Sequence, residues 1–300
     1  MIPTPIQTIQ HSLFPQKGIQ LFLKREDLNH PLIMGNKWRK LKYNLQQAKT
    51  EGYQQLLTFG GAFSNHIYAT AAAGKEFGFQ TIGIIRGERI EPLNTTLQFA
   101  EAQGMQLHFI SRTAYRNKNH SDFLAALQKQ FGRSYILPEG GSNTLAVKGC
   151  AEIVTEIDMD YTHLCVPCGT GSTMAGIIVG NNDKGKVIGF PAMKGGGFLK
   201  QDIQTLLGTT HQDLNNWSLE LNYHFGGFAK FKPPLIEFIN AFKEAHHIPL
   251  EPLYTGKMLY GIFEKIKQNG FPKGSVIIAI HTGGLQGIEG FNQRFGNLLV

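Results

Sequence analysis

One lysine stands where an amine nucleophile is expected. Lys37 lies in the run of residues 35–41, Gly-Asn-Lys-Trp-Arg-Lys-Leu. Asn36 can cap a helix by accepting hydrogen bonds from backbone N–H groups, which makes Lys37 the first helical residue. The positive end of the helix dipole, with Arg39 and Lys40 close in sequence, lowers the pKa of the amine. A neutral lysine attacks an aldehyde; the alternative interpretation is a solvated basic first turn.

A glycine loop supplies the second candidate, because it follows an apolar strand and opens a helix. Free backbone N–H groups at such a point bind phosphate. Met174 stands where the dinucleotide fingerprint needs a glycine, and residues 176–178 lack the lysine of a P-loop. The loop therefore favours one phosphate monoester held without magnesium, with a tight strand-to-helix turn as the alternative. The residues of this loop are Gly169, Thr170, Gly171, Ser172 and Thr173.

Ser64, Asn65 and His66 repeat this strand–glycine–helix geometry after Gly60 and Gly61. Their amides can hold a second anion, such as a substrate carboxylate, and Ser64 can carry a proton. The alternative is that Ser64 or Asn65 only caps the helix that follows.

Three more glycine turns carry polar side chains. Residues 254–257 read Tyr-Thr-Gly-Lys and residues 281–284 read His-Thr-Gly-Gly, so each places a hydroxyl just before a glycine. Side chains at such turns commonly line a cleft. In the third turn, residues 138–143, Asn143 or Ser142 is the natural cap of the next helix.

Composition excludes several classes of protein. With 42% hydrophobic and 17% charged residues and 35 glycines, the chain is typical of a compact enzyme. The net charge of +7 is spread without a dense basic run, so no nucleic-acid partner is expected, and no apolar run is long enough for a membrane span. Small anionic ligands account for the charge equally well.

The three cysteines, Cys150, Cys165 and Cys168, lack the spacing of a disulfide framework. The single C-x-x-C has no partner pair, so buried structural thiols are favoured over metal or redox work, and no metal site is expected. A reducing cytoplasm is the expected compartment.

Alternating strand and helix patterns predict a parallel α/β fold. After a strand at 19–23 and the Lys37 helix, the small-domain pattern has strands at 55–59, 81–85, 105–110 and 134–137 and helices at 65–77, 93–102 and 122–131. The later pattern has helices at 146–157, 234–245 and 258–268 and strands at 163–167, 187–189 and 275–280. We predict a larger domain from residues 1–50 and 137–300, and a smaller α/β domain from residues 51–136.

An activatable lysine, a phosphate loop without nucleotide features and an anion-binding helix start together describe a site for pyridoxal phosphate. The chain resembles the fold type II pyridoxal-phosphate family that contains 1-aminocyclopropane-1-carboxylate (ACC) deaminase and D-cysteine desulfhydrase. The resemblance implies the two-domain fold of the tryptophan synthase beta-subunit-like enzymes. It runs nearly end to end, through residues 4–7, 24–27, 35–37, 64–66, 138–143, 169–173, 254–257 and 281–284.

The resemblance implies a role for each matched residue. Lys37 forms the imine with the cofactor and moves the Cα proton, and Tyr254 faces the substrate as acid, base or nucleophile. Residues 64–66 receive the substrate carboxylate, and Asn65 also lies beside the pyridine ring. Residues 169–173 bind the cofactor phosphate, while Thr282, with Thr255 nearby, is the partner of the pyridine nitrogen. Subunits of this family usually pair as homodimers.

Three departures bear on the substrate. ACC deaminases carry a glutamate directly after the matched tyrosine, where this chain has Thr255, as in the desulfhydrase pattern. Phe228 stands where the family tends to have a second tyrosine, and Phe63 replaces a frequent glutamine. The first two departures disfavour ring-opening of ACC, since Phe228 puts a ring that cannot ionise in place of a phenol, and the third makes the wall of the site more apolar.

The leading hypothesis is a lyase that eliminates a β-substituent from a small, D-configured amino acid to give a keto acid and ammonia. The alternatives are ACC deamination with the same cofactor and a catalytically quiet ligand-binding protein that retains the fold. An NAD-dependent oxidoreductase is disfavoured by Met174.

Overall fold

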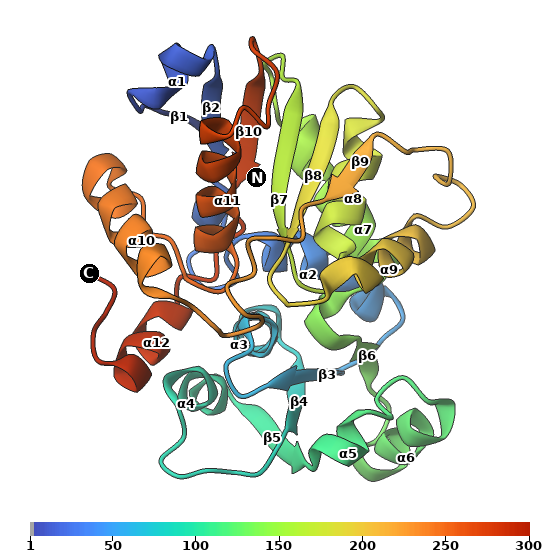
Figure 1. Cartoon of the computed structure of the whole chain (residues 1–300). Coiled ribbons are helices and arrows are strands. Elements are labelled where there is room, and N and C mark those ends of the chain that lie inside the picture. The colour runs from blue at the N-terminus through green and yellow to red at the C-terminus, as the bar shows by residue number, and fades with distance from the viewer. Residues whose placement is uncertain (1–2) are drawn as a thin grey trace.

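Two sheets organise the chain in a computed structural model that describes residues 3–300 (Figure 1). The larger sheet has the order β1-β2-β10-β7-β8-β9. All its neighbours pair in parallel except β1 with β2. Its strands are β1 (Ile6–Ile9), β2 (Gln20–Lys24), β7 (His163–Cys168), β8 (Lys186–Pro191), β9 (Trp217–Leu219) and β10 (Val276–Ile280).

The smaller sheet is wholly parallel, with the order β5-β4-β3-β6. Its strands are β3 (Gln55–Gly61), β4 (Gln80–Arg86), β5 (Met105–Ile110) and β6 (Tyr135–Leu137). They follow one another in a single stretch of chain, whereas the larger sheet draws on the segments before and after that stretch. The predicted parallel α/β fold is confirmed.

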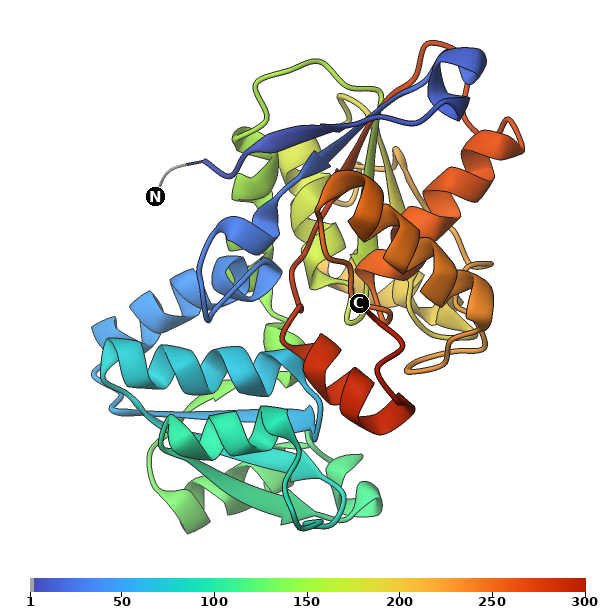
Figure 2. The same cartoon turned by 90° about the vertical axis from the view of Figure 1, so that its left-hand side faces the viewer.

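Helices cover both faces of each sheet, as Figure 2 shows from the side. Those before β6 are α1 (Leu13–Lys17), α2 (Asn36–Thr50), α3 (Asn65–Phe77), α4 (Thr95–Ala102), α5 (Arg112–Tyr115) and α6 (Ser121–Phe131). Those after it are α7 (Thr144–Thr155), α8 (Ser172–Asn181), α9 (Leu199–Leu207), α10 (Pro233–His246), α11 (Thr255–Lys267) and α12 (Gly287–Phe295). Short 3-10 turns occupy Glu26–Leu28, Glu139–Gly141 and Gly196–Phe198.

Strand β10 shows how the larger sheet is buried on both faces. Ile277 and Ala279 join the core formed with α10 and α11, while Ile278 and Ile280 join the core formed with α7, α8 and α9. Successive side chains of a strand point to opposite faces, so a continuous apolar run is what a doubly covered parallel strand requires.

A buried ionic cluster fixes the position of α2, which contacts both α7 and α3. Arg39 of α2 donates from Nε to Glu26 Oε2 at 2.8 Å, and its Nη1 lies 2.7 Å from Glu156 Oε1. Lys24 reaches the same Glu156 at 3.0 Å. Removing one partner from such a cluster leaves a buried charge uncompensated, which is strongly destabilising.

The sequence located the long elements and missed several short ones. Of the two predicted candidates, Asn143 and Ser142, it is Asn143 that caps α7, through a bond from Ala146 N. Helix α11 begins three residues earlier than predicted, so Gly256 is helical and does not form a turn. β9 and α12 were not predicted. The domain limits at residues 51 and 136 stay a prediction.

Within residues 3–300, no helix combines the length and apolarity needed to cross a bilayer. The same residues contain no cluster of three or more histidine, cysteine, aspartate or glutamate side chains suited to a metal ion.

Candidate active site

A cavity of about 600 Å³ lies where the carboxyl ends of β3, β7 and β10 approach one another. Crevices at the carboxyl ends of parallel strands are the usual binding sites of open α/β sheets. Ten of the predicted site residues line the cavity: Lys37, Ser64, Asn65, His66, Gly169, Thr170, Gly171, Thr173, Tyr254 and Thr282. Ser172 and Thr255 are fully buried and do not line it.

The helix that carries Lys37 starts differently from the prediction. Asn36 is the first helical residue rather than the cap; the cap is Gly35, with a φ of 69°. A Cβ at Gly35 would lie 1.9 Å from the carbonyl oxygen of Thr282, so only glycine fits there. Asn36 instead donates from its backbone to that carbonyl at 3.2 Å and from its side chain to the Thr173 hydroxyl at 2.9 Å.

Lys37 has an amine free to react. Within residues 3–300 its Nζ forms no hydrogen bond or ion pair. Burial lowers its pKa well below the usual value, and the positive charge of Lys40 lowers it further. The predicted direction is confirmed, but the predicted help from Arg39 is not seen, because its guanidinium is paired with carboxylates of Glu26 and Glu156.

Lys40 is a second lysine that lines the cavity, and unlike Lys230, which also lines it, Lys40 is buried. Its side chain is buried and donates from Nζ to the carbonyl oxygen of Gly140 at 3.2 Å. Burial also lowers the pKa of Lys40. It is therefore the competing amine against which the assignment of Lys37 is to be tested.

The glycine loop after β7 has the features of an anion cradle. Gly171 is the N-cap of α8 with a φ of 82°, and the hydroxyls of Thr170 and Ser172 are buried without a hydrogen-bond partner. Buried polar groups are normally paired, so the Thr170 hydroxyl, whose residue lines the cavity, marks a place for an additional acceptor. A Cβ at Gly169 would lie 3.2 Å from the ring of Tyr254, so a side chain there would press on that ring. The residues fit a phosphate group.

Cys168 ends β7 beside this loop. It and the other two cysteines are buried and free. Burial raises the pKa of Cys150 to about 11 and that of Cys168 to about 12, so both stay protonated thiols.

Ser64 caps α3 on the opposite side of the cavity. Its Oγ accepts hydrogen bonds from the backbone N–H groups of His66 at 3.2 Å and Ile67 at 3.3 Å. Both lone pairs are then occupied, so the hydroxyl can donate its proton but cannot accept another without leaving the cap. Asn65 is oriented by Gln286, whose Nε2 donates to Asn65 Oδ1 at 2.7 Å.

His66 is neutral, and its ring is held against strand β3 of the smaller sheet. Its Nε2 lies 2.8 Å from the Thr58 hydroxyl, which itself donates to the carbonyl oxygen of Leu137 at 3.0 Å. The Thr58 oxygen therefore accepts from Nε2, and Nδ1 is left as an acceptor without a partner. Burial, and then Lys37 and Lys40, hold the pKa of His66 well below its usual value.

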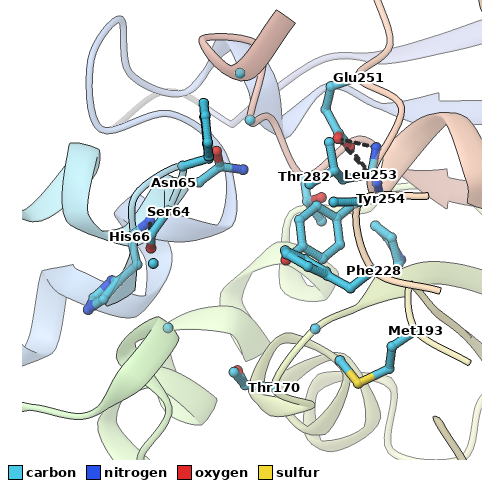
Figure 3. A pocket seen from close by; sticks show the side chains of 18 of the residues that line it. Ser64, Asn65, His66, Thr170, Met193, Phe228, Glu251, Leu253, Tyr254 and Thr282 are labelled. Carbon is cyan, nitrogen blue, oxygen red and sulfur yellow. Dashed lines mark hydrogen bonds between the residues drawn. The ribbon is translucent and has the colours of Figure 1, made fainter. Parts of the chain in front are cut away.

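Tyr254 is presented by a residue that the sequence analysis missed. The buried carboxylate of Glu251 accepts from the backbone N–H groups of Leu253 at 2.7 Å, Tyr254 at 2.9 Å and Thr255 at 2.6 Å (Figure 3). It thereby caps α11, where a negative charge is stabilised by the helix dipole. Burial and the Glu251 charge raise the pKa of Tyr254, so its phenol stays protonated.

Thr255 belongs to this cap and not to the cavity wall. Its hydroxyl donates to Glu251 Oε1 at 3.1 Å and is fully buried. Glu251 precedes the helix, whereas the sequence signals of a helix start are a Ser, Thr, Asp or Asn cap and a glutamate three residues after it, so no local signal pointed to Glu251.

Phe228 lies against Tyr254 on the larger-sheet side of the cavity, with ring centroids 6.0 Å apart and an edge-on angle of 63° (Figure 3). Its loop has an unusual backbone, since the neighbouring residues Phe225, Gly226, Gly227 and Ala229 all have positive φ. Lys257 of α11 holds this loop through bonds from Nζ to the carbonyl oxygens of Ala192, His224 and Gly227, at 3.1, 3.0 and 2.9 Å.

Comparison with known proteins agrees with this site. Residues 1–283 match the model of the family described as "Pyridoxal-phosphate dependent enzyme". A bifunctional D-cysteine desulfhydrase/1-aminocyclopropane-1-carboxylate deaminase, mitochondrial, of Arabidopsis thaliana is 30% identical over 96% of this chain and 77% of its own length.

Solved structures agree as well. That of an ACC deaminase homologue superposes with a TM-score of 0.85 at 26% identity, covering 100% of this chain and 94% of its own. A fungal L-serine ammonia-lyase from Rhizomucor miehei shares the fold, with a TM-score of 0.64 at 17% identity over 94% of both chains.

Proposed function

The chain belongs to the pyridoxal-phosphate dependent enzyme family, and on that premise we propose that it is a lyase acting on the β-substituent of a D-configured amino acid, as a D-cysteine desulfhydrase does. With D-cysteine, one water is consumed and pyruvate, ammonia and hydrogen sulfide are released. The observation that carries the proposal is an unpaired lysine of lowered pKa lining the same cavity as a glycine loop with an unpartnered threonine hydroxyl.

Pyridoxal phosphate supplies an aldehyde and an electron-withdrawing ring to such a reaction. Gly169, Thr170, Gly171 and Thr173 would hold its phosphate, with Ser172 supporting the loop from behind. Asn65 would lie beside the ring, and Thr282, which follows β10 in the cavity wall, would face the pyridine nitrogen.

Lys37 would bond to the cofactor aldehyde and then serve the substrate as a base. Because burial keeps its amine neutral at a lower pH than usual, Nζ can take the proton from the substrate Cα. No carboxylate pairs with that amine in residues 3–300, so its lone pair stays available.

Ser64 and Tyr254 would act as donors. The Ser64 hydroxyl keeps its proton for the substrate carboxylate, since its lone pairs cap α3. The protonated phenol of Tyr254 can give its proton to the leaving group. The free ring nitrogen of His66 is an acceptor, so it cannot donate a hydrogen bond to a carboxylate. His66 would therefore contribute to carboxylate binding by shaping the helix start.

ACC deamination is the second candidate, since the plant relative carries both activities in its name. Here the position after Tyr254 is a threonine whose hydroxyl is bonded to Glu251 and turned from the cavity. That placement supports the desulfhydrase reaction over ring-opening.

The purified protein, loaded with pyridoxal phosphate, should release keto acid from D-cysteine faster than from equal concentrations of L-cysteine or ACC. Faster release from ACC would reverse the order of the two candidates. Bound cofactor without turnover of any amino acid would favour the third hypothesis, a ligand-binding protein.

We further propose that the enzyme is a homodimer in the cytoplasm. The family resemblance supports the homodimer, and the three free cysteines support the cytoplasm. Light scattering of the loaded protein measures its oligomeric state.

A further inference from the structure

The mouth of the cavity is lined by an unusual number of phenylalanine rings. Five of them contribute to its wall: Phe63, Phe228, Phe231, Phe291 and Phe295. Three remain well exposed, Phe63 and Phe228 at 47% and Phe295 at 37%. Exposed apolar patches that border a cavity commonly mark binding surfaces, because leaving them in water is unfavourable. We call these five rings the phenylalanine wall.

The wall is a packed surface. Phe231 contacts both Phe291 and Phe295 edge-on, with ring centroids 5.0 and 4.9 Å apart, and Phe291 lies 4.9 Å from Phe295. Phe63 reaches the same helix from the smaller sheet, because a Cβ at Gly290 would lie only 3.5 Å from its ring. Because these rings are already held in place, they lose little conformational entropy when an apolar group binds against them.

Two members of the wall, Phe63 and Phe228, are its most exposed rings and line the cavity from different elements. They belong to opposite sides of the cavity, one following β3 and the other in the loop held by Lys257. Neither ring offers the cavity a hydrogen-bonding group, which a thiol or hydroxyl substituent would use.

Charged side chains line the cavity as well, and they suit a different part of the ligand. Arg86, Lys230 and Arg294 are exposed at the mouth. Exposed cations are screened by salt and attract anions in general, so they favour entry of the carboxylate and phosphate that this site already requires. These cations do not provide the neutral hydrogen-bonding groups that the phenylalanine wall lacks.

We propose that the preferred substrates carry an apolar group on the β-substituent, as in thioethers of cysteine, and that the phenylalanine wall binds that group. This rests on the proposed lyase function. The Cα–H and Cβ–S bonds break, and R–S–CH2–CH(NH3⁺)–COO⁻ with one water gives R–SH, pyruvate and ammonium. The sulfur leaves as the thiol with one proton, and water supplies the keto oxygen of pyruvate.

The test is a series of D-cysteine and its S-methyl, S-propyl and S-benzyl derivatives with the loaded enzyme. Each methylene buried against the wall is expected to raise kcat/KM about four-fold. The double variant Phe63→Gln with Phe228→Tyr should flatten this dependence on the size of the apolar group. Phe198→Gln, which changes a phenylalanine that is 53% exposed and outside the cavity, should leave the dependence intact.

Binding separates this inference from the proposed function. The same series is titrated calorimetrically into Lys37→Ala loaded with the cofactor, where turnover is not required. Affinities that rise with the size of the apolar group support the wall even if the wild type turns over none of the compounds, a result that would refute only the lyase function. Affinity and kcat/KM that stay level or fall along the series would overturn the inference.

Discussion

The side-chain amide of Asn36 donates to the hydroxyl of Thr173 at 2.9 Å, across 137 positions of the chain. This bond joins the helix start that carries Lys37 to the loop proposed to hold the cofactor phosphate. The distance between the reactive amine and the phosphate site is thereby fixed by a direct contact between the two elements.

Asn36→Ala is expected to weaken cofactor binding about five-fold to ten-fold, because a typical net hydrogen bond contributes about 1 kcal/mol. Equilibrium dialysis of pyridoxal phosphate measures the change. Gln47→Ala, on an exposed position of the same helix, should have no effect. Equal retention by Asn36→Ala and the wild type would show that the contact has no role in binding.

Thr170→Val should weaken cofactor retention more than Ser172→Ala does. Within residues 3–300 the Thr170 hydroxyl has no hydrogen-bond partner, and Thr170 lines the cavity. Ser172 also has an unpartnered hydroxyl but does not line the cavity. A lost bond to a charged phosphate is worth about 1.5–3 kcal/mol, or roughly ten-fold to one-hundred-fold in affinity. If dialysis shows the larger loss for Ser172→Ala, the phosphate is bound on the other side of the loop.

Lys257→Met should raise KM several-fold with little change in kcat, because the loop of Phe228 loses two hydrogen bonds from the Lys257 ammonium, which also ties that loop to Ala192 after β8. Burial lowers the pKa of Lys257 to about 8, against the opposing charge of Glu251. The wild-type KM should therefore rise above pH 8 and the KM of the variant should not. Lys267→Met, which removes an exposed lysine from the same helix, is the control; identical pH profiles for the wild type and Lys257→Met would contradict the assignment.

Acid should destabilise the protein in part through His66. Its native pKa is lowered by burial, so below the unfolded value of about 6.5 the unfolded chain binds a proton that the native chain does not. Stability then falls with decreasing pH by at most about 1.4 kcal/mol per unit from this group. Urea denaturation between pH 8 and pH 5 should show a shallower decline for His66→Gln; parallel declines would mean that the pKa of His66 is the same in the native and unfolded states.

The parts predicted from sequence are those with local signals. Strand, glycine and helix succeed one another around residues 60–66 and 167–173, and the backbone of such a junction exposes its N–H groups whatever surrounds it. The amphipathic pattern around Lys37 likewise defined α2 to within one residue at its start.

What sequence did not reveal depends on contacts between distant segments. Asn36 has the residue type of a cap, but Gly35 packs against Thr282 and shifts the helix start by one position. Helix α12 carries two glycines that lower its helix propensity, and it forms through packing of Phe291 against Phe231. Glu251 could be recognised as the cap only from the exact start of α11, which was predicted three residues too late.

The central claim is that Lys37 is the lysine that bonds to pyridoxal phosphate. Borohydride reduction makes the bond between the cofactor and its lysine permanent, and peptide mapping then identifies the labelled residue. We predict a pyridoxyl group on Lys37 in the wild type, and in Lys37→Ala a loss of the visible absorbance of the lysine imine with no label elsewhere. A label on Lys40, the other buried lysine of the cavity, would contradict the account.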